Sequence, residues 1–305
     1  MYYIDMKNKY KGIIPPLVTP LLNHSELDIV GLKKLIEHVI TGGVHGIFIL
    51  GTTGEAQSLS MELRIKMIKE TSRLLKKRLP LLVGISDTSL LDSLHLAQIA
   101  YEYGADAVVS APPYYFATGQ PELAEFYESL VLQLKLPLFL YNMPTHTKVS
   151  FTPATIKRIA RNSKVVGFKD SSGNGAYLQS VLYEMRHNDD FTVLVGPEEI
   201  MAEAVLLGAD GGVNGGANLF PKLYVDLYNA AVEGDLRTVR KLQMKVLQIS
   251  RTIYTQGDYG SSYLKGLKCA LSICGICNGF MASPFNQFDE PHEERIRKAL
   301  STIDL

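Results

Sequence analysis

The sequence has no surplus of charge and no long apolar run. Its 31 lysine and arginine residues equal its 31 aspartate and glutamate residues. With no basic excess, electrostatics do not support binding to nucleic acid or to an anionic membrane, and we expect neither as a partner. No apolar stretch reaches the roughly 18 residues of a transmembrane helix. Residues 1–11 carry charges without an apolar core, so we expect no signal peptide and a cytoplasmic protein.

Cysteine is also scarce. The three cysteines, Cys269, Cys274 and Cys277, lie close together in an apolar segment with helical spacing. A zinc or iron–sulfur site would need a fourth ligand, and no histidine or further cysteine lies nearby. We therefore expect free, buried thiols in a reducing compartment, and no metal.

Short apolar runs alternate with longer amphipathic stretches. The runs are rich in Val, Ile, Leu and Phe without polar alternation, which is typical of parallel strands covered on both faces. The candidate strands are Ile13–Leu21, Gly46–Leu50, Leu81–Ile85, Ala107–Ala111, Leu138–Tyr141, Val165–Lys169, Thr192–Val195 and Gly212–Asn214.

Helix signals lie between these runs. Residues 32–40 form one apolar stripe that Gly42–Gly43 closes as a C-terminal cap. Thr152–Pro153 and Gln120–Glu122 are typical helix starts. These segments predict helices that connect consecutive parallel strands.

From Pro221 onward the pattern is helical, and no Ser- or Gly-rich linker precedes it. Eight βα units with right-handed crossovers close into a barrel. The sequence therefore predicts an α/β fold: a (β/α)₈ TIM barrel over residues 1–221, with C-terminal helices over residues 222–305 packed on it as one structural unit. A doubly wound open sheet is the competing architecture.

Lys169 is the first residue with a chemical signal, because it closes the apolar run Val165–Lys169. Desolvation lowers the pKa of a lysine, and a neutral amine is the form that attacks a ketone carbonyl. The carboxyl ends of barrel strands are also where catalysis occurs. The alternative is a strand-end lysine whose ammonium group reaches solvent.

Tyr141 ends the preceding run and is followed by Asn142, Met143 and Pro144. Neighbouring barrel strands place their ends side by side, so Tyr141 is expected to lie close to Lys169. A phenol can carry a proton to or from a substrate hydroxyl when a nearby cation lowers its pKa. The alternative is a tyrosine packed under a loop with its hydroxyl bonded to the backbone.

A glycine-flanked turn, Gly51–Glu55, follows the run Gly46–Leu50. Its amides and the hydroxyls of Thr52 and Thr53 can hold a carboxylate or a phosphate. It is not a Walker loop, because the lysine and the longer spacing are missing. A plain turn that caps a helix would use similar residues.

The segment Pro112–Phe116 follows the apolar run Ala107–Ala111. Its two prolines restrict the backbone, and its aromatic rings follow them. It is either part of a site or an interface and loop-packing cluster.

Together these residues resemble the dihydrodipicolinate synthase / N-acetylneuraminate lyase family of pyruvate-dependent class I aldolases. Over roughly residues 11–300 the motifs fall in the family's order and on corresponding strands: Gly51–Glu55, Pro113–Tyr115, Tyr141–Pro144 and Gly167–Asp170. By that resemblance Lys169 forms a Schiff base with a 2-keto acid such as pyruvate, and Tyr141 donates and accepts the proton.

The resemblance implies further roles. Thr52 and Thr53 match residues that hold the keto acid's carboxylate and pass protons. Tyr115 matches a tyrosine contributed across a subunit interface, which implies a homotetramer built as a dimer of dimers. Val213 matches a position whose backbone carbonyl faces bound pyruvate. No cofactor is implied, because an iminium replaces a Lewis-acid metal.

One departure concerns the second substrate. Dihydrodipicolinate synthases carry an arginine two residues after the proline that Pro144 matches, and here that residue is His146. A largely neutral histidine lacks the charged bidentate fork that holds a carboxylate, so aspartate semialdehyde is disfavoured. Glu198 lies where sialic acid lyases place sugar-binding groups, and its carboxylate can accept hydrogens from sugar hydroxyls. The neighbouring Pro197 is unexpected there.

The sequence therefore predicts an enzyme, a carbon–carbon lyase that reversibly cleaves a 2-keto-3-deoxy sugar acid or related 2-keto acid to pyruvate and an aldehyde. Within the family, the alternatives are 4-hydroxy-tetrahydrodipicolinate synthesis from pyruvate and aspartate semialdehyde, N-acetylneuraminate cleavage, and dehydration of a keto-deoxy sugar acid. The alternative from a different class is a barrel that binds a keto acid without turnover, against which intact Lys169 and Tyr141 argue.

Overall fold

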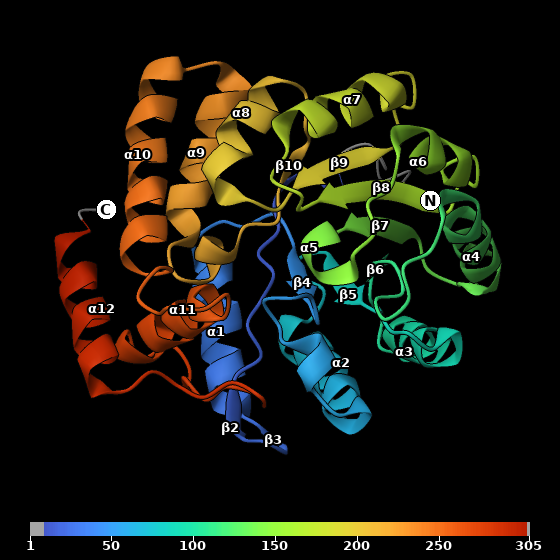
Figure 1. Cartoon of the computed structure of the whole chain (residues 1–305). Coiled ribbons are helices and arrows are strands. Elements are labelled where there is room, and N and C mark those ends of the chain that lie inside the picture. The colour runs from blue at the N-terminus through green and yellow to red at the C-terminus, as the bar shows by residue number, and fades with distance from the viewer. Residues whose placement is uncertain (1–8, 304–305) are drawn as a thin grey trace.

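The structure is a computed structural model that describes residues 9–303. Eight parallel strands form one sheet in the order β1-β10-β9-β8-β7-β6-β5-β4. The strands are β1 (Gly12–Ile13), β4 (Ile47–Ile49), β5 (Leu81–Gly84), β6 (Ala107–Ser110), β7 (Leu138–Asn142), β8 (Val165–Asp170), β9 (Thr192–Val195) and β10 (Gly211–Gly212). A bridge between Pro16 and Phe48 joins the chain after β1 to β4. The sheet therefore closes into the predicted TIM barrel, and the open-sheet alternative is wrong (Figure 1).

Helices surround the barrel and continue beyond its last strand. They are α1 (Ile29–Thr41), α2 (Met61–Leu75), α3 (Leu90–Glu102), α4 (Gln120–Gln133), α5 (Pro144–Thr147), α6 (Pro153–Ile159), α7 (Gly175–Met185), α8 (Met201–Leu206), α9 (Pro221–Glu233), α10 (Leu236–Thr252), α11 (Ser262–Ile273) and α12 (Glu290–Thr302). Within residues 9–303 no helix is both long enough and apolar enough to cross a membrane.

The helix starts follow the predicted signals. The Thr152 side chain accepts a hydrogen bond from the Thr155 amide at the start of α6. At the start of α4 the Glu122 carboxylate accepts from the Gly119 amide. Such contacts satisfy backbone donors that the first helical turn leaves free. They fix where each connecting helix begins over the sheet.

The core has two layers because each strand is buried on both faces. On β7, Leu138 and Leu140 pack outward against the helices, whereas Phe139 and Tyr141 point into the barrel. Phe48 of β4 and Leu194 of β9 belong to the same inner layer. Both faces are apolar, which explains why the sequence shows continuous apolar runs.

An irregularity in β8 determines which way Lys169 points. The pairing of β7 with β8 skips Val166, since Leu138 pairs with Val165 and Phe139 pairs with Gly167. Val166 packs inside the barrel, while Phe168 packs outside it. An extra residue reverses the side-chain alternation. Without it, Lys169 would face the helices and not the barrel interior.

Two strand predictions were too long. The run Ile13–Leu21 contains only the two-residue strand β1, because Pro15 and Pro16 have no N–H group to continue the ladder. Its end, Leu21, instead begins the antiparallel pair of β2 (Leu21–Asn23) and β3 (Glu26–Leu27). The last run, Gly212–Asn214, is also corrected, since β10 ends at Gly212.

The C-terminal helices pack on one side of the barrel (Figure 1). Helix α9 contacts both β1 and α8, as expected of the helix that completes the ring. Helix α10 packs on α9, and α12 packs on α11. The predicted division at residue 221 falls at the first residue of α9. The division of the chain into a barrel over residues 1–221 and C-terminal helices over residues 222–305 stays a prediction.

The three cysteines are free, but they are not all buried. Cys277 is buried, Cys269 is half-buried and Cys274 is exposed. Cys274 caps the end of α11, where the chain reaches the surface. The expectation of a uniformly buried thiol cluster was therefore wrong for Cys274.

Candidate active site

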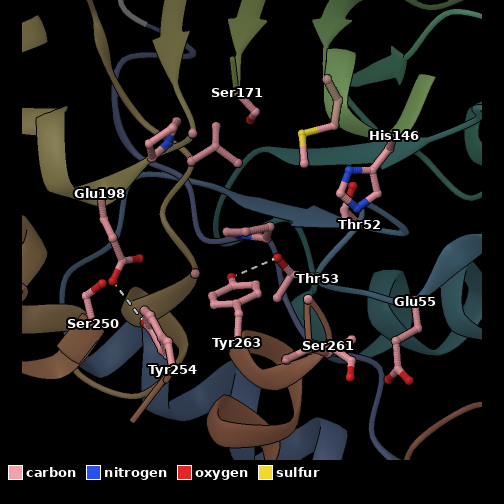
Figure 2. Close-up of a pocket in the computed structure, with 18 of the residues that line it drawn as sticks. Thr52, Thr53, Glu55, His146, Ser171, Glu198, Ser250, Tyr254, Ser261 and Tyr263 are labelled. Carbon is pink, nitrogen blue, oxygen red and sulfur yellow. Dashed lines mark hydrogen bonds between the residues drawn. The ribbon is translucent and has the colours of Figure 1, made fainter. Parts of the chain in front are cut away.

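A cavity of about 800 Å³ opens at the carboxyl ends of the barrel strands. The turn after β4 contributes Thr52 and Thr53, while β7 and β8 contribute Tyr141 and Lys169. The opposite wall comes from the C-terminal helices and includes Tyr263. In Figure 2 the hydroxyls of Tyr263 and Thr53 point toward each other and are joined by a hydrogen bond. Parallel barrels place such pockets at this end of the sheet.

Lys169 lies in the cavity wall and is only 5% exposed. Its Nζ is 4.0 Å from the centre of the Tyr141 ring and 5.1 Å from the centre of the Phe48 ring. Burial lowers the pKa of Lys169, and the nearby Tyr141 partly opposes that effect. Desolvation favours the neutral amine over the ammonium. Lys169 can therefore act as a nucleophile toward a carbonyl carbon.

Tyr141 lies beside Lys169 because the two residues are register partners on β7 and β8. The Tyr141 hydroxyl is 3.1 Å from Oγ1 of Thr52, and either atom can be the donor. A phenol with a hydroxyl partner on one side and an amine on the other can both accept and donate a proton. The geometry thus joins a nucleophile to a short proton path.

The turn that carries Thr52 and Thr53 has an unusual backbone. Leu50 and Glu55, at its two ends, are non-glycine residues with φ of 58° and 56°. This left-handed conformation costs a non-glycine residue about 1–2 kcal/mol, so the surrounding contacts must hold it. The turn directs the Thr53 hydroxyl to the Tyr263 hydroxyl at 3.1 Å.

A buried pair of polar side chains fixes the ends of β7 and β8. Nδ2 of Asn142 donates to Oδ1 of Asp170 at 2.8 Å, and both residues are fully buried. Burial raises the pKa of Asp170, while hydrogen bonds from Asn142 and Ser172 oppose the shift. Asn142 and Asp170 follow Tyr141 and Lys169 directly, so this contact holds the two reactive groups in register.

A sequence profile of the dihydrodipicolinate synthetase family matches residues 9–303. The chain belongs to that family. Among curated relatives of this family, the probable 2-dehydro-3-deoxy-D-pentonate aldolase YjhH of Escherichia coli (strain K12) is 32% identical over 86% of this chain and 87% of its own length.

Solved structures of family members are similar throughout. A dihydrodipicolinate synthase from Bacteroides thetaiotaomicron is 67% identical, with a TM-score of 0.94 over 95% of this chain and 98% of that one. YagE from E. coli K12, determined in complex with pyruvate, is 30% identical, with a TM-score of 0.91 over 96% of this chain and 98% of that one. The family thus includes both aldolases and synthases.

Most of the residues predicted from the sequence line the one cavity: Lys169, Tyr141, Thr52, Thr53, Val213, His146 and Glu198. Val213 is buried, and its amide donates to the Val195 carbonyl. His146 projects from α5 at the rim (Figure 2), and partial burial lowers its pKa. A neutral imidazole is a weak partner for a carboxylate, as the sequence indicated. The roles given to these residues stay predictions.

Glu198 is buried more completely than a sugar-binding carboxylate needs to be. Its Oε1 accepts hydrogen bonds from the hydroxyls of Tyr224 (2.5 Å) and Tyr254 (2.9 Å). Its Oε2 accepts from the Gly216 amide at 2.9 Å. Burial raises the pKa of Glu198 to about 7, although the bonds from Tyr224 and Gly216 oppose the shift. Both carboxylate oxygens are thus engaged within the protein.

This pKa predicts how stability depends on pH. The folded value near 7 exceeds the ordinary value of 4.5, so between them the folded state of Glu198 binds more protons than the unfolded state. The free energy of unfolding therefore falls as the pH rises through this window. A Glu198→Gln variant lacks that dependence, so its Tm relative to wild type should rise between about pH 5 and about pH 8. Parallel Tm curves for the two proteins would contradict the assignment.

Tyr115 is the predicted residue that does not reach the cavity within one chain. It is 75% exposed, in the loop after β6, and packs edge-to-face on Phe116, which is 78% exposed. Its predicted place across a subunit interface and the homotetramer stay predictions.

The sequence missed the wall formed by the C-terminal segment. Tyr254 and Tyr263 line the cavity with their rings packed edge-to-face at 4.8 Å. Gly215 faces this wall, since a Cβ there would collide with the Tyr263 hydroxyl. Tyrosines in a helical pattern look like ordinary core residues. The short break Gly257–Ser261 before α11 was the available signal that the chain crosses the barrel mouth there.

Proposed function

We propose that this protein is a Schiff-base-forming lyase that reversibly cleaves a 2-keto-3-deoxy sugar acid, or a related 2-keto acid, to pyruvate and an aldehyde. One observation carries the proposal. The buried amine of Lys169 lies against the ring of Tyr141, at the carboxyl end of adjacent barrel strands. That arrangement provides the nucleophile and the proton carrier that the reaction requires.

The reaction begins with the Lys169 amine attacking the C2 ketone of the substrate. Tyr141 donates its proton to the departing oxygen, so water leaves and an iminium remains. The resulting phenolate removes the proton of the 4-hydroxyl. The C3–C4 bond then breaks, the aldehyde leaves, and the electron pair passes to the iminium to give an enamine. Tyr141 returns the proton to C3, and hydrolysis releases pyruvate and the free amine.

Other residues of the cavity bind the substrate carboxylate and relay protons. The amides and hydroxyls of Thr52 and Thr53 hold the substrate carboxylate, and Thr52 exchanges protons with Tyr141 through their 3.1 Å contact. Tyr115 of a neighbouring subunit completes the relay in the proposed tetramer. The Val213 carbonyl faces the bound keto acid.

The charges around the cavity favour a neutral aldehyde. Among the described residues that line it, Lys169 is the single lysine and none is an arginine, whereas Glu55, Glu198 and Glu199 contribute carboxylates, of which Glu55 is paired with Lys268. Once Lys169 has reacted, His146 is the remaining basic side chain, and its pKa is lowered. A second substrate with a carboxylate would lie among acidic groups without a cationic partner. Hydroxyl groups of a sugar suit the uncharged polar side chains of this wall, such as Ser171 and Ser250, better.

The named activities of relatives agree with this choice in part. YjhH and YagE are named as aldolases of 2-dehydro-3-deoxy sugar acids. The 67%-identical B. thetaiotaomicron protein is named a dihydrodipicolinate synthase, so condensation of pyruvate with aspartate semialdehyde is the second candidate. His146 in place of the synthase arginine argues against it.

A pyruvate-release screen separates these candidates. Keto-deoxy pentonate, keto-deoxy gluconate and N-acetylneuraminate are offered to the purified protein, and aspartate semialdehyde is offered together with pyruvate. We expect pyruvate release from a keto-deoxy sugar acid and poor condensation with the semialdehyde. Efficient condensation would overturn the assignment. Borohydride with pyruvate gives a separate test, since a barrel that only binds keto acids would gain no covalent adduct.

A further inference from the structure

A buried ion pair lies behind the threonine turn. Nζ of Lys268, on α11, is 2.5 Å from Oε1 of Glu55, and the two side chains are 0% and 2% exposed. The ammonium group also donates to the carbonyls of Thr19 (2.9 Å) and Phe280 (2.5 Å). Oε2 of Glu55 accepts from the Ala282 amide at 2.8 Å. The three ammonium hydrogens thus each have an acceptor. Through these contacts the C-terminal segment binds the turn Gly51–Glu55 on the side that faces away from Tyr263.

Such a pair is weak as a device for stability alone. Both charges lose their hydration on burial, and a well-packed neutral pair of similar volume is often as stable. What this pair does hold is a strained residue. Glu55 has a φ of 56°, an uncommon conformation that costs a non-glycine residue energy, and its buried contacts help to hold it.

The strained residue is directly bonded to the proton path. The amide of Glu55 donates to the Thr52 carbonyl at 3.0 Å. The Thr52 hydroxyl is in turn 3.1 Å from the Tyr141 hydroxyl, beside Lys169. In Figure 2 the Glu55 carboxylate points away from the Tyr263 hydroxyl, while Thr53 points toward it. The turn Gly51–Glu55 therefore carries both the Glu55 carboxylate, which is paired with Lys268, and the Thr52 hydroxyl, which contacts Tyr141.

A second contact supports the same turn. The Thr19 hydroxyl donates to the Gly54 carbonyl at 2.7 Å, and the Thr19 carbonyl accepts from Lys268. Lys268 thus holds Glu55 directly and Gly54 through Thr19. Loss of the ammonium group removes the contact with Glu55 and the contact that anchors the Thr19 carbonyl, while the Thr19 hydroxyl keeps its bond to Gly54.

We propose that Lys268 and Glu55 are positioning residues: their buried ion pair holds the Thr52 hydroxyl within hydrogen-bond distance of Tyr141, and so sets the rate of proton transfer at C3 of the enamine. This inference rests on the proposed function. Tyr141 also assists the loss of water when the Schiff base forms, but borohydride trapping at saturation measures how much iminium forms and not how fast, so it depends less on the turn.

The test uses the double variant Glu55→Gln/Lys268→Met, which removes both charges and nearly keeps the volume. Each single change leaves one charge buried and unpaired, so we expect a lower Tm for either single variant than for the double variant. In the double variant we expect exchange of the pyruvate methyl hydrogens with deuterium from the solvent to fall about 10- to 100-fold, the scale of a displacement of roughly 1 Å. Borohydride trapping of pyruvate at saturation should stay close to wild type. Proton NMR measures the first quantity and mass spectrometry the second.

The matched control is Lys157→Met, which breaks the exposed pair of Lys157 with Glu184 and should leave both measurements unchanged. Should the double variant not fold, Thr19→Val removes only the hydroxyl bond to Gly54, and we expect a smaller fall in exchange. Wild-type exchange in a folded variant, or equal losses of exchange and trapping, would overturn the inference. A wild-type protein that neither traps nor exchanges pyruvate would overturn the proposed function, and the inference with it.

Discussion

Replacing Lys169 with methionine is expected to abolish the borohydride-stable adduct with pyruvate. It should also lower kcat by roughly 10⁴-fold or more, the scale seen when a covalent nucleophile is removed. Methionine has no amine, so no iminium can form and the C3–C4 bond has no electron sink. The end of the Lys169 side chain lies against the rings of Phe48 and Tyr141, and an unbranched thioether suits these apolar surroundings. The Tm should therefore equal or exceed that of the wild type, because a desolvated amine is lost.

Intact-protein mass spectrometry after borohydride reduction measures the adduct, and the rate of pyruvate release measures kcat. Lys164→Met is the matched control, because Lys164 precedes the opposite end of β8 and is exposed, with Nζ bonded to the Leu134 carbonyl. It should keep both the adduct and the rate. An adduct of the same mass on the Lys169→Met protein would mean that another amine forms the imine, and the proposed mechanism would be wrong.

Six of the eight strands could be predicted from the sequence because they are continuous apolar runs. From β4 to β9 each strand is covered by helices outside and by side chains inside, so periodicity and burial agree. The first and last strands were harder to bound. There Pro15 and Pro16 stop the ladder after β1, and Gly211 and Gly212 form β10. The prolines, together with pairing across the barrel seam, decide where these strands end.

The positions of Lys169 and Tyr141 at neighbouring strand ends could be predicted, but not the side of the sheet that the Lys169 side chain faces. Lys169 and Tyr141 end adjacent apolar runs, which was enough to place them side by side. The inward direction of Lys169, however, depends on the extra residue at Val166. A bulge is a property of two paired strands, and Gly167 in the β8 sequence is compatible with one without fixing which residue is extra.

The supports of the site were not predictable at all. Lys268 lies in the same helix as the buried Leu264, Leu267 and Leu271, where a charge looks like an irregular polar position. Its partner Glu55 is 213 positions away in the sequence. Only the packing of the C-terminal helices on the barrel mouth brings the two charges together.

Replacing Tyr141 with phenylalanine is expected to separate imine formation from bond cleavage. The ring that packs on the Lys169 amine remains, so the amine stays desolvated and should still trap pyruvate under borohydride, although more slowly because Tyr141 no longer protonates the departing oxygen. The hydroxyl that contacts Thr52 is lost, and with it the group that removes the 4-hydroxyl proton. We expect kcat to fall about 10²- to 10⁴-fold, the usual contribution of a positioned acid–base group.

Measuring kcat and KM separately distinguishes a lost acid–base group from weaker binding, because a uniform loss of binding would raise KM with little change in kcat. Tyr127→Phe is the matched control: that tyrosine is fully buried behind β6, and its hydroxyl donates to the Ser110 carbonyl at 2.9 Å. The control should lose about 1 kcal/mol of stability with its hydrogen bond and keep its rate. If Tyr141→Phe cleaves a keto-deoxy sugar acid at the wild-type rate, the phenol carries no proton in the reaction, and the role of Thr52 as its partner fails with it.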